Sequence, residues 1–232
     1  MRQWLLGLAI VASTALVDAS TQMFMAGPAT RTFLGFRLLD LDGNLVQWGT
    51  GRADEVVTVT YAFARRPIRF EDALNCAGLV PLDALLARSG VDFEQLREEA
   101  RIAFSMWESV ADIRFREVNA ARADILIGAQ AEPTGHAFAD VKYKSGEGAW
   151  RQIERSLICL NPVKRWKIGF DGNLKVYDLR YTLAHEIGHA IGLDHPQPGG
   201  QIMSARYEER FRTLQFGDVA GAVQLYGLRR SQ

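Results

Sequence analysis

The sequence predicts a single α+β domain, in which a twisted, mixed sheet of about five strands packs against a small number of helices. Apolar residues alternate along one face between Val57 and Phe63, as they do in a half-buried strand. Between Phe93 and Trp107 they recur at helical spacing. A third observation is the HEIGHAIGLDH segment at residues 185–195. Its second glycine, Gly192, indicates a helix that ends in a sharp turn. Strands that precede and separate the helices favour the α+β class.

The first 19 residues predict a signal peptide. Met1-Arg2 is a short basic start, Trp4 to Val17 is an apolar run, and small residues precede a cleavage site near Ala19. The apolar run is too short to span a bilayer comfortably. We therefore expect export to the periplasm or the cell exterior, with no stable membrane span after cleavage. The alternative is an uncleaved N-terminal segment that anchors the chain.

Cleavage would leave about 210 residues, enough for one domain with a good core. We divide the chain into the signal peptide (1–19), an N-terminal extension with a hairpin (20–50) and the main domain (51–232). The composition is that of a folded, soluble protein, with 48% hydrophobic and 23% charged residues. Its formal net charge is zero, which gives no electrostatic footprint for nucleic acid.

Local signals place the elements in order. Asp42-Gly43-Asn44 is a turn signal between two apolar-rich arms, and Pro81 and Gly90 are typical of a helix start and stop. Asp178 is a suitable N-cap for the helix that carries the HEIGH residues. The elements expected on these grounds are a hairpin at 33–48, a strand at 56–63, helices at 81–90 and 93–110, short strands at 113–115, 125–127 and 157–160, and the capped helix after 178.

The HEIGHAIGLDH segment holds three of the four histidines in the chain. Residues four apart share a helix face, so His185 and His189 are able to bind one metal ion. Glu186 lies beside the first ligand, where it would act as a general base without binding the metal. Gly192 would let the chain turn back and bring His195 to the ion. Three protein ligands leave one coordination position open, which is typical of a catalytic zinc.

Met203 follows His195 by eight residues. HExxHxxGxxH with a methionine turn resembles the signature of the metzincin zinc endopeptidases, and within them the matrixins are most similar. The resemblance covers roughly residues 45 to 228. It implies a zincin-like catalytic domain, with a closing helix from Leu214 to Gly227. Gly217 of that helix stands where the family usually carries an acid.

The resemblance also implies roles for residues outside the zinc segment. Met203 would form an apolar floor beneath the imidazoles, and Tyr207 would shape the pocket for the side chain after the scissile bond. An alternative role for Tyr207 is a hydrogen bond to the reacting water. The expected substrate-binding edge strand consists of Gly135, His136, Ala137 and Phe138. An exposed edge of this kind is able to pair with an extended peptide.

These features predict a zinc-dependent endopeptidase that hydrolyses internal peptide bonds of proteins through a zinc-activated water. Glu186 would accept the proton of that water. The alternatives are a metal-binding recognition module without catalysis, and a zinc exopeptidase. We expect a protein or peptide substrate, no nucleic-acid partner and a monomeric chain. The resemblance implies a secreted protein, as the association of matrixins with the extracellular matrix suggests.

One catalytic zinc is the expected cofactor. A second, structural zinc is not expected, because His136 is the only histidine outside the segment. Asp140 would allow a calcium site, but the spacing does not indicate one. Cys76 and Cys159 leave three alternatives: a disulfide, which export favours, two buried thiols, or a Cys76 that blocks the open zinc position. We expect no cysteine-switch propeptide of the kind that keeps many matrixins latent, because cleavage near Ala19 would leave too little chain before the first strand.

Overall fold

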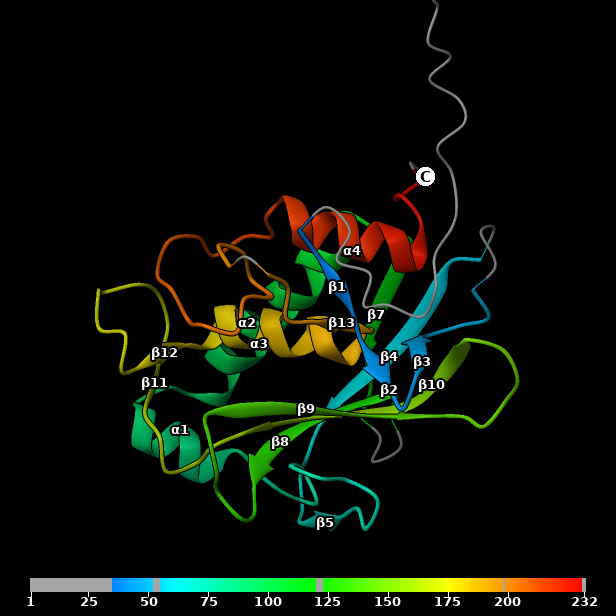
Figure 1. Cartoon of the computed structure of the whole chain (residues 1–232). Coiled ribbons are helices and arrows are strands. Elements are labelled where there is room, and N and C mark those ends of the chain that lie inside the picture. Colours follow the sequence, from blue (N-terminus) through cyan, green and yellow to red (C-terminus); the bar gives the residue numbers. More distant parts are fainter. Residues whose placement is uncertain (1–34, 52–54, 120–122, 198, 231–232) are drawn as a thin grey trace, which may run out of the picture. The chain divides into compact units, whose positions relative to one another are not determined.

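The structure is a computed structural model that describes residues 35–51, 55–119, 123–197 and 199–230 (Figure 1). The predicted signal peptide, residues 1–19, lies outside the described residues, as do residues 20–34 of the predicted extension. Among the described residues, no helix has the length and apolarity needed to cross a bilayer.

Five strands form the centre of a mixed sheet, in the order β7-β4-β8-β10-β9. The strands are β4 (Val57–Phe63), β7 (Ile113–Glu117), β8 (Ile125–Gln130), β9 (Ala137–Tyr143) and β10 (Trp150–Leu160). Neighbouring strands are parallel, except that β9 runs antiparallel to β10. The mixed α+β architecture confirms the predicted fold class.

Four short strands extend the hydrogen-bonded sheet to nine, more than the sequence predicted. They are β2 (Asp40–Leu41), β3 (Asn44–Gln47), β5 (Ile68–Arg69) and β6 (Gly78–Val80). The strand predicted at 157–160 was also too short, because β10 begins at Trp150. The first half of β10 is largely polar and partly exposed, so it lacks the apolar run that marks the buried half.

Helices α2 (Phe93–Glu108) and α3 (Leu179–Ala190) pack on one face of the sheet, and α4 (Phe216–Tyr226) lies on the same side beyond α3 (Figure 1). The predicted apolar positions of α2 are buried, and the Trp107 indole donates a 3.0 Å hydrogen bond to the Ala184 carbonyl of α3. The fourth helix, α1 (Asp83–Ser89), ends at Gly90, which has a φ of 68°. A two-stranded parallel sheet of β11 (Trp166–Lys167) and β12 (Tyr177–Asp178) precedes α3.

The predicted N-terminal hairpin is present between Asp40 and Gln47, where β2 and β3 are antiparallel. The chain before it departs from the prediction. Strand β1 (Arg37–Leu38) pairs instead with β13 (Leu193–Asp194), directly after the end of α3. Strand β3 also pairs with β10, so the hairpin belongs to the main sheet. The domain boundary at residue 50 stays a prediction.

The turn between α3 and β13 depends on Gly192. Its φ is 109°, a conformation that side chains other than glycine rarely adopt. A Cβ atom built at this position would lie 2.3 Å from the Val46 carbonyl oxygen of β3. The Leu39 amide also donates a 2.8 Å hydrogen bond to the Gly192 carbonyl. The chain around Leu39 and Val46 therefore packs tightly against this turn, where no residue larger than glycine fits.

One disulfide ties the loop before β6 to β10. Cys76 and Cys159 are both fully buried and form this bond, although they are 83 positions apart in the sequence. The Asp140 carboxylate accepts hydrogen bonds from the Asn75 and Cys76 amides, each at 2.8 Å. Asp140 therefore holds this loop in place through backbone donors.

Replacing Gly192 with Ala tests the packing of the turn. We expect Gly192→Ala to lower the free energy of unfolding by about 3 kcal/mol, through strain at positive φ and overlap with Val46. Gly43→Ala is the control, because Gly43 has a φ of 80° and no atom within 4 Å of an added Cβ. It should cost only about 1 kcal/mol. If urea denaturation showed the same loss of free energy of unfolding in both variants, this result would contradict the close approach of β3 to Gly192.

Removing the disulfide tests the link between the loop and β10. We expect Cys76→Ser with Cys159→Ser to lower the free energy of unfolding by about 2–4 kcal/mol, because the unfolded chain gains freedom. Chemical denaturation measures the loss. Mass spectrometry of the alkylated, non-reduced chain provides the control, and labelling of both cysteines would contradict the bond.

Candidate active site

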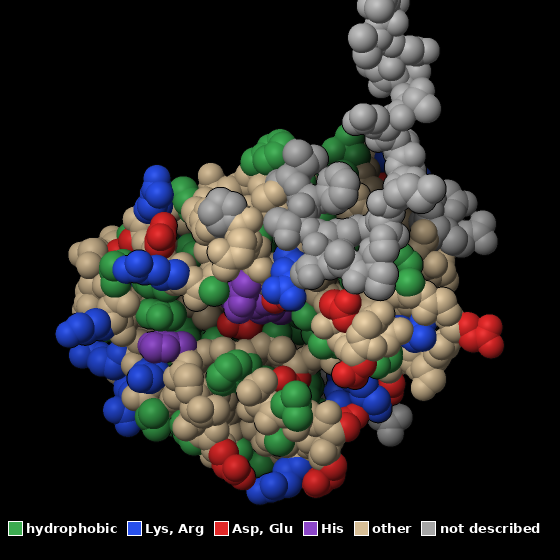
Figure 2. All heavy atoms as spheres, viewed as in Figure 1, with side chains coloured by type: hydrophobic (Ala, Val, Ile, Leu, Met, Phe, Trp, Pro, Cys, Tyr) green, Lys and Arg blue, Asp and Glu red, His purple; other side chains and the backbone are tan. Residues whose placement is uncertain are grey.

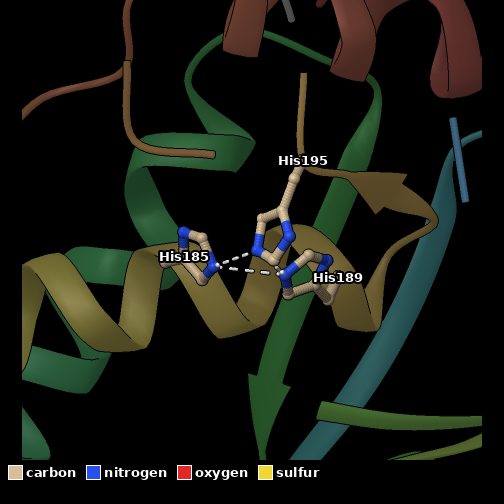
Figure 3. A group of neighbouring side chains, drawn as sticks. All are labelled: His185, His189 and His195. Atoms are coloured by element: carbon tan, nitrogen blue, oxygen red, sulfur yellow. Dashed lines mark hydrogen bonds between the residues drawn. The ribbon is translucent and has the colours of Figure 1, made fainter. Parts of the chain in front are cut away.

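Helix α3 carries the first two histidines and Glu186. The helix begins after Asp178, whose carboxylate accepts a 2.8 Å hydrogen bond from the Tyr181 amide, as predicted for its N-cap. Nine of its twelve residues are buried, so packing against the sheet and α2 fixes its position. His185 and His189 point from one face of α3, and His195 reaches the same point after the Gly192 turn (Figure 3).

The three imidazoles converge through their Nε2 atoms, which lie 3.1 Å apart in each pair. The Nδ1 atoms of His185 and His189 face the carbonyls of Ile202 and Leu193, at 2.7 and 2.8 Å. A carbonyl only accepts, so each of these Nδ1 atoms carries the proton. The Nε2 atoms of His185 and His189 then point lone pairs into the centre of the triad.

This donor set fits a metal ion. Tetrahedral zinc with Zn–N distances of about 2.0–2.1 Å would place its nitrogens about 3.3 Å apart, close to the observed spacing. Burial lowers the pKa of all three histidines, that of His185 well below its usual range and that of His189 to about 4. Neutral imidazole is the form that binds metal. Among the described residues, these histidines are the one group of three or more clustered metal-ligand side chains.

Glu186 lies beside the triad but outside the ligand set. Its side chain lines the cleft, and the residue is only 6% exposed. Burial raises the pKa of Glu186 to about 8, since no positive group offsets the loss of water. A bound cation nearby would favour the ionised form again. The carboxylate is therefore placed to exchange a proton with a group in the cleft.

Met203 packs beneath the helix, with 2% of its surface exposed. Gly188 of α3 leaves room for it, because a Cβ atom there would lie 2.1 Å from the Met203 sulfur. The amides of Ile202 and Met203 each donate a 3.0 Å hydrogen bond to the Asp218 carboxylate. Sequence reasoning missed this role of Asp218. The feature of the sequence that could have indicated this role is the position of Asp218, an acidic residue in the first turn of α4.

A cleft of about 750 Å³ runs past the triad. Figure 2 shows histidine side chains gathered in a hollow near the centre of this face. Of the predicted substrate-binding residues, His136, Ala137, Phe138 and Tyr207 line the cleft. Gly135 does not line it, and its carbonyl accepts a hydrogen bond from the Asn161 side chain. The edge strand begins at Ala137 and continues to Tyr143, beyond the predicted range.

Strand β9 forms one wall of the cleft. In the part of the chain that the structure describes, β9 pairs only with β10, so its other edge keeps free backbone donors and acceptors. Free edges of this kind accept an extended peptide as an additional strand. The cleft therefore combines a metal-ligand group, a buried carboxylate and an open strand edge.

Aromatic rings form another part of the cleft wall. Tyr177 stacks between His136, at 4.1 Å, and Tyr207, at 4.2 Å between ring centroids. Tyr181 meets the Tyr207 ring edge-on at 4.9 Å. Sequence reasoning missed the contributions of Tyr177 and Tyr181, although both precede His185 closely. The stack occupies one face of the His136 imidazole.

The Tyr207 hydroxyl has two partners away from the triad. It accepts a 3.0 Å hydrogen bond from the Asp178 amide and donates a 2.9 Å bond to Glu209. These bonds hold the ring in the wall. They support the pocket-wall role of Tyr207 over the alternative role at the reacting water.

Comparison with known proteins agrees with this geometry. The sequence model of the matrixin family matches residues 86–227. The chain is 31% identical to human stromelysin-3 over 148 residues, 33% identical to mouse matrix metalloproteinase-19 over 150 and 31% identical to Arabidopsis thaliana metalloendoproteinase 1-MMP over 153.

These matches cover 58%, 61% and 58% of the chain, but only 28%, 27% and 38% of the respective relatives. The chain thus spans less than half the length of these relatives. The family match covers about three fifths of the chain and includes α3, the methionine turn and α4. Because it spans more than half of the sequence, the chain belongs to the matrixin family, whose characterised members are zinc metalloendopeptidases.

Proposed function

We propose that this chain is a zinc-dependent endopeptidase that hydrolyses internal peptide bonds of proteins or peptides outside the cytoplasm. The convergence of three histidine Nε2 atoms at 3.1 Å, beside the Glu186 carboxylate, is the observation that carries the proposal. Membership of the matrixin family supports the same reaction class.

His185, His189 and His195 would hold the ion, oriented by the carbonyls that accept from His185 and His189. When bound, zinc lowers the pKa of water toward neutrality and polarises the substrate carbonyl. Glu186 accepts the proton of the attacking water on a carboxylate oxygen. It then passes that proton to the nitrogen of the leaving amine. One carboxylate thus serves as base and then as acid.

Substrate orientation would come from β9 and the aromatic wall. An extended peptide would pair with the free edge of β9, which places its scissile carbonyl next to the triad. The side chain after the scissile bond would point toward Tyr181 and Tyr207. A cleft that accepts an extended backbone favours cleavage within a chain over trimming at its end.

An extracytoplasmic location has two supports. The disulfide between Cys76 and Cys159 is a bond that persists in oxidising compartments. The first 19 residues also have the pattern of a signal peptide. Mass spectrometry of the mature N-terminus would test this location directly, with cleavage expected near Ala19.

Metal analysis tests the triad. We expect one zinc per chain and a lower melting temperature after chelation, because the ion binds only the folded triad. With free zinc a thousand-fold above its dissociation constant, the stabilisation would be about 4 kcal/mol. His195→Ala should lose most of this zinc-dependent stabilisation. A chain with no bound zinc, and a melting temperature that does not respond to zinc, would contradict the metal centre.

Glu186→Gln tests the proton transfer. The amide keeps the size of the side chain but cannot accept a proton, so kcat/KM should fall by about 10²–10⁴-fold while zinc content stays that of the parent. Glu98→Gln is the control, because Glu98 is exposed on α2. A Glu186→Gln variant that cleaves at the parental rate would remove Glu186 from the mechanism.

A mixed peptide library, analysed with and without chelator, distinguishes the candidate functions. We expect zinc-dependent cleavage at internal bonds. Trimming from one end would indicate an exopeptidase. Zinc binding without any cleavage would indicate a recognition module.

A further inference from the structure

A lysine with only a small part of its side chain exposed lies behind the aromatic wall of the cleft. The Lys167 side chain is 12% exposed, and its ammonium contacts three oxygen acceptors. They are the Asp171 carboxylate, the Glu209 carboxylate at 2.5 Å and the Asn173 carbonyl at 3.0 Å. Two carboxylates and a carbonyl around one positive centre resemble the oxygen ligands that proteins offer to a hard cation.

Glu209 connects this ammonium to the loop that follows Met203. Its side chain is only 5% exposed, and both carboxylate oxygens are occupied. Oε1 contacts Lys167 and accepts from the Tyr207 hydroxyl at 2.9 Å, while Oε2 accepts from the Asp171 and Gly172 amides at 3.1 and 2.6 Å. One carboxylate therefore joins the segment before α3 to the loop after the methionine turn.

Both partners of this ion pair are charged at neutral pH. Burial alone would raise the pKa of Glu209, but hydrogen bonds from Lys167, Gly172 and Tyr207 lower it overall. Burial alone would likewise lower the pKa of Lys167, and its bonds to Asp171 and Glu209 raise it instead. Removing one charge would leave the other largely shielded from water without its main partner, which weakens this contact.

Tyr207 transmits the position of Glu209 to the cleft. Its hydroxyl lies between Glu209 and the amide of Asp178, the N-cap residue of α3. Its ring lines the cleft and stacks on Tyr177. A shift of the Glu209 carboxylate would therefore move the wall that faces the substrate.

We propose that the Lys167 ammonium is a built-in cation that positions Tyr207 through Glu209, and so determines which side chains the cleft accepts after the scissile bond. This inference rests on the proposed peptidase function for its consequence in specificity. Lys167 and Glu209 are positioning residues, since neither lines the cleft.

The experiment compares Lys167→Met and Glu209→Gln with the parent. Lys167→Arg is the conservative variant, and Lys175→Met is the matched control, because Lys175 lies on the same segment and is exposed. Two peptides would differ only in the residue after the scissile bond, one carrying a residue that the parent prefers and one a residue that it rejects. The measured quantity is the ratio of their kcat/KM values.

We expect this ratio to fall by about tenfold in Lys167→Met and Glu209→Gln, with parental zinc content. Lys167→Arg should restore most of the ratio, and Lys175→Met should keep it. A general loss of stability would lower both kcat/KM values together and leave their ratio unchanged. An unchanged ratio in folded, zinc-loaded Lys167→Met and Glu209→Gln would overturn the proposal.

Amide hydrogen exchange of residues 204–215 gives a second measurement that needs no hydrolysis. Loss of the ammonium or of the Glu209 charge should accelerate exchange in this loop, while Lys175→Met should not. If Lys167→Met does not fold, the nearly isosteric Glu209→Gln carries both measurements. Unchanged exchange would overturn the positioning role. Faster exchange in a chain that cleaves no peptide would refute the proposed function and leave the positioning role standing.

Discussion

The active site depends on holding three imidazoles with their Nε2 atoms 3.1 Å apart. Such an approach is unfavourable without a cation, because lone pairs converge and burial disfavours protonation. Backbone carbonyls fix the rings: Ile202 orients His185, and Leu193 orients His189. The first carbonyl belongs to the methionine turn and the second to β13, directly after the Gly192 turn. These two segments therefore also set which nitrogen of each ring faces the centre of the triad.

Distant parts of the chain hold these two turns. Asp218 of α4 binds the amides of the methionine turn, and Val46 of β3 packs against Gly192. Trp107 of α2 adds a hydrogen bond to α3, the helix that precedes both turns. Preorganisation of this kind matters because ligand rings that are already oriented lose little freedom on binding. Much of the surrounding fold thus serves to fix a few carbonyl oxygens.

The sequence predicted what is encoded locally. The HExxH spacing, the Asp178 cap and the Gly90 stop lie within one or two helical turns, so pattern and capping chemistry identified them. It did not predict the pairing of β1 with β13 or the exposed half of β10, because these depend on partners far away in the chain. The Tyr177 stack and the link from Lys167 to Glu209 were missed for the same reason. Side chains brought together by tertiary structure leave no periodic signal.

An internal ammonium differs from a bound metal ion in one physical respect. A metal ion dissociates, so the order that it imposes depends on its free concentration. Lys167 is covalently part of the chain, and the entropy of bringing its charge to Glu209 is lost once, on folding. The position of Tyr207 would then be independent of dissolved divalent ions, while hydrolysis would still require zinc. Substrate preference and catalysis would thus rest on two separate cations, of which only the catalytic one exchanges with the surroundings.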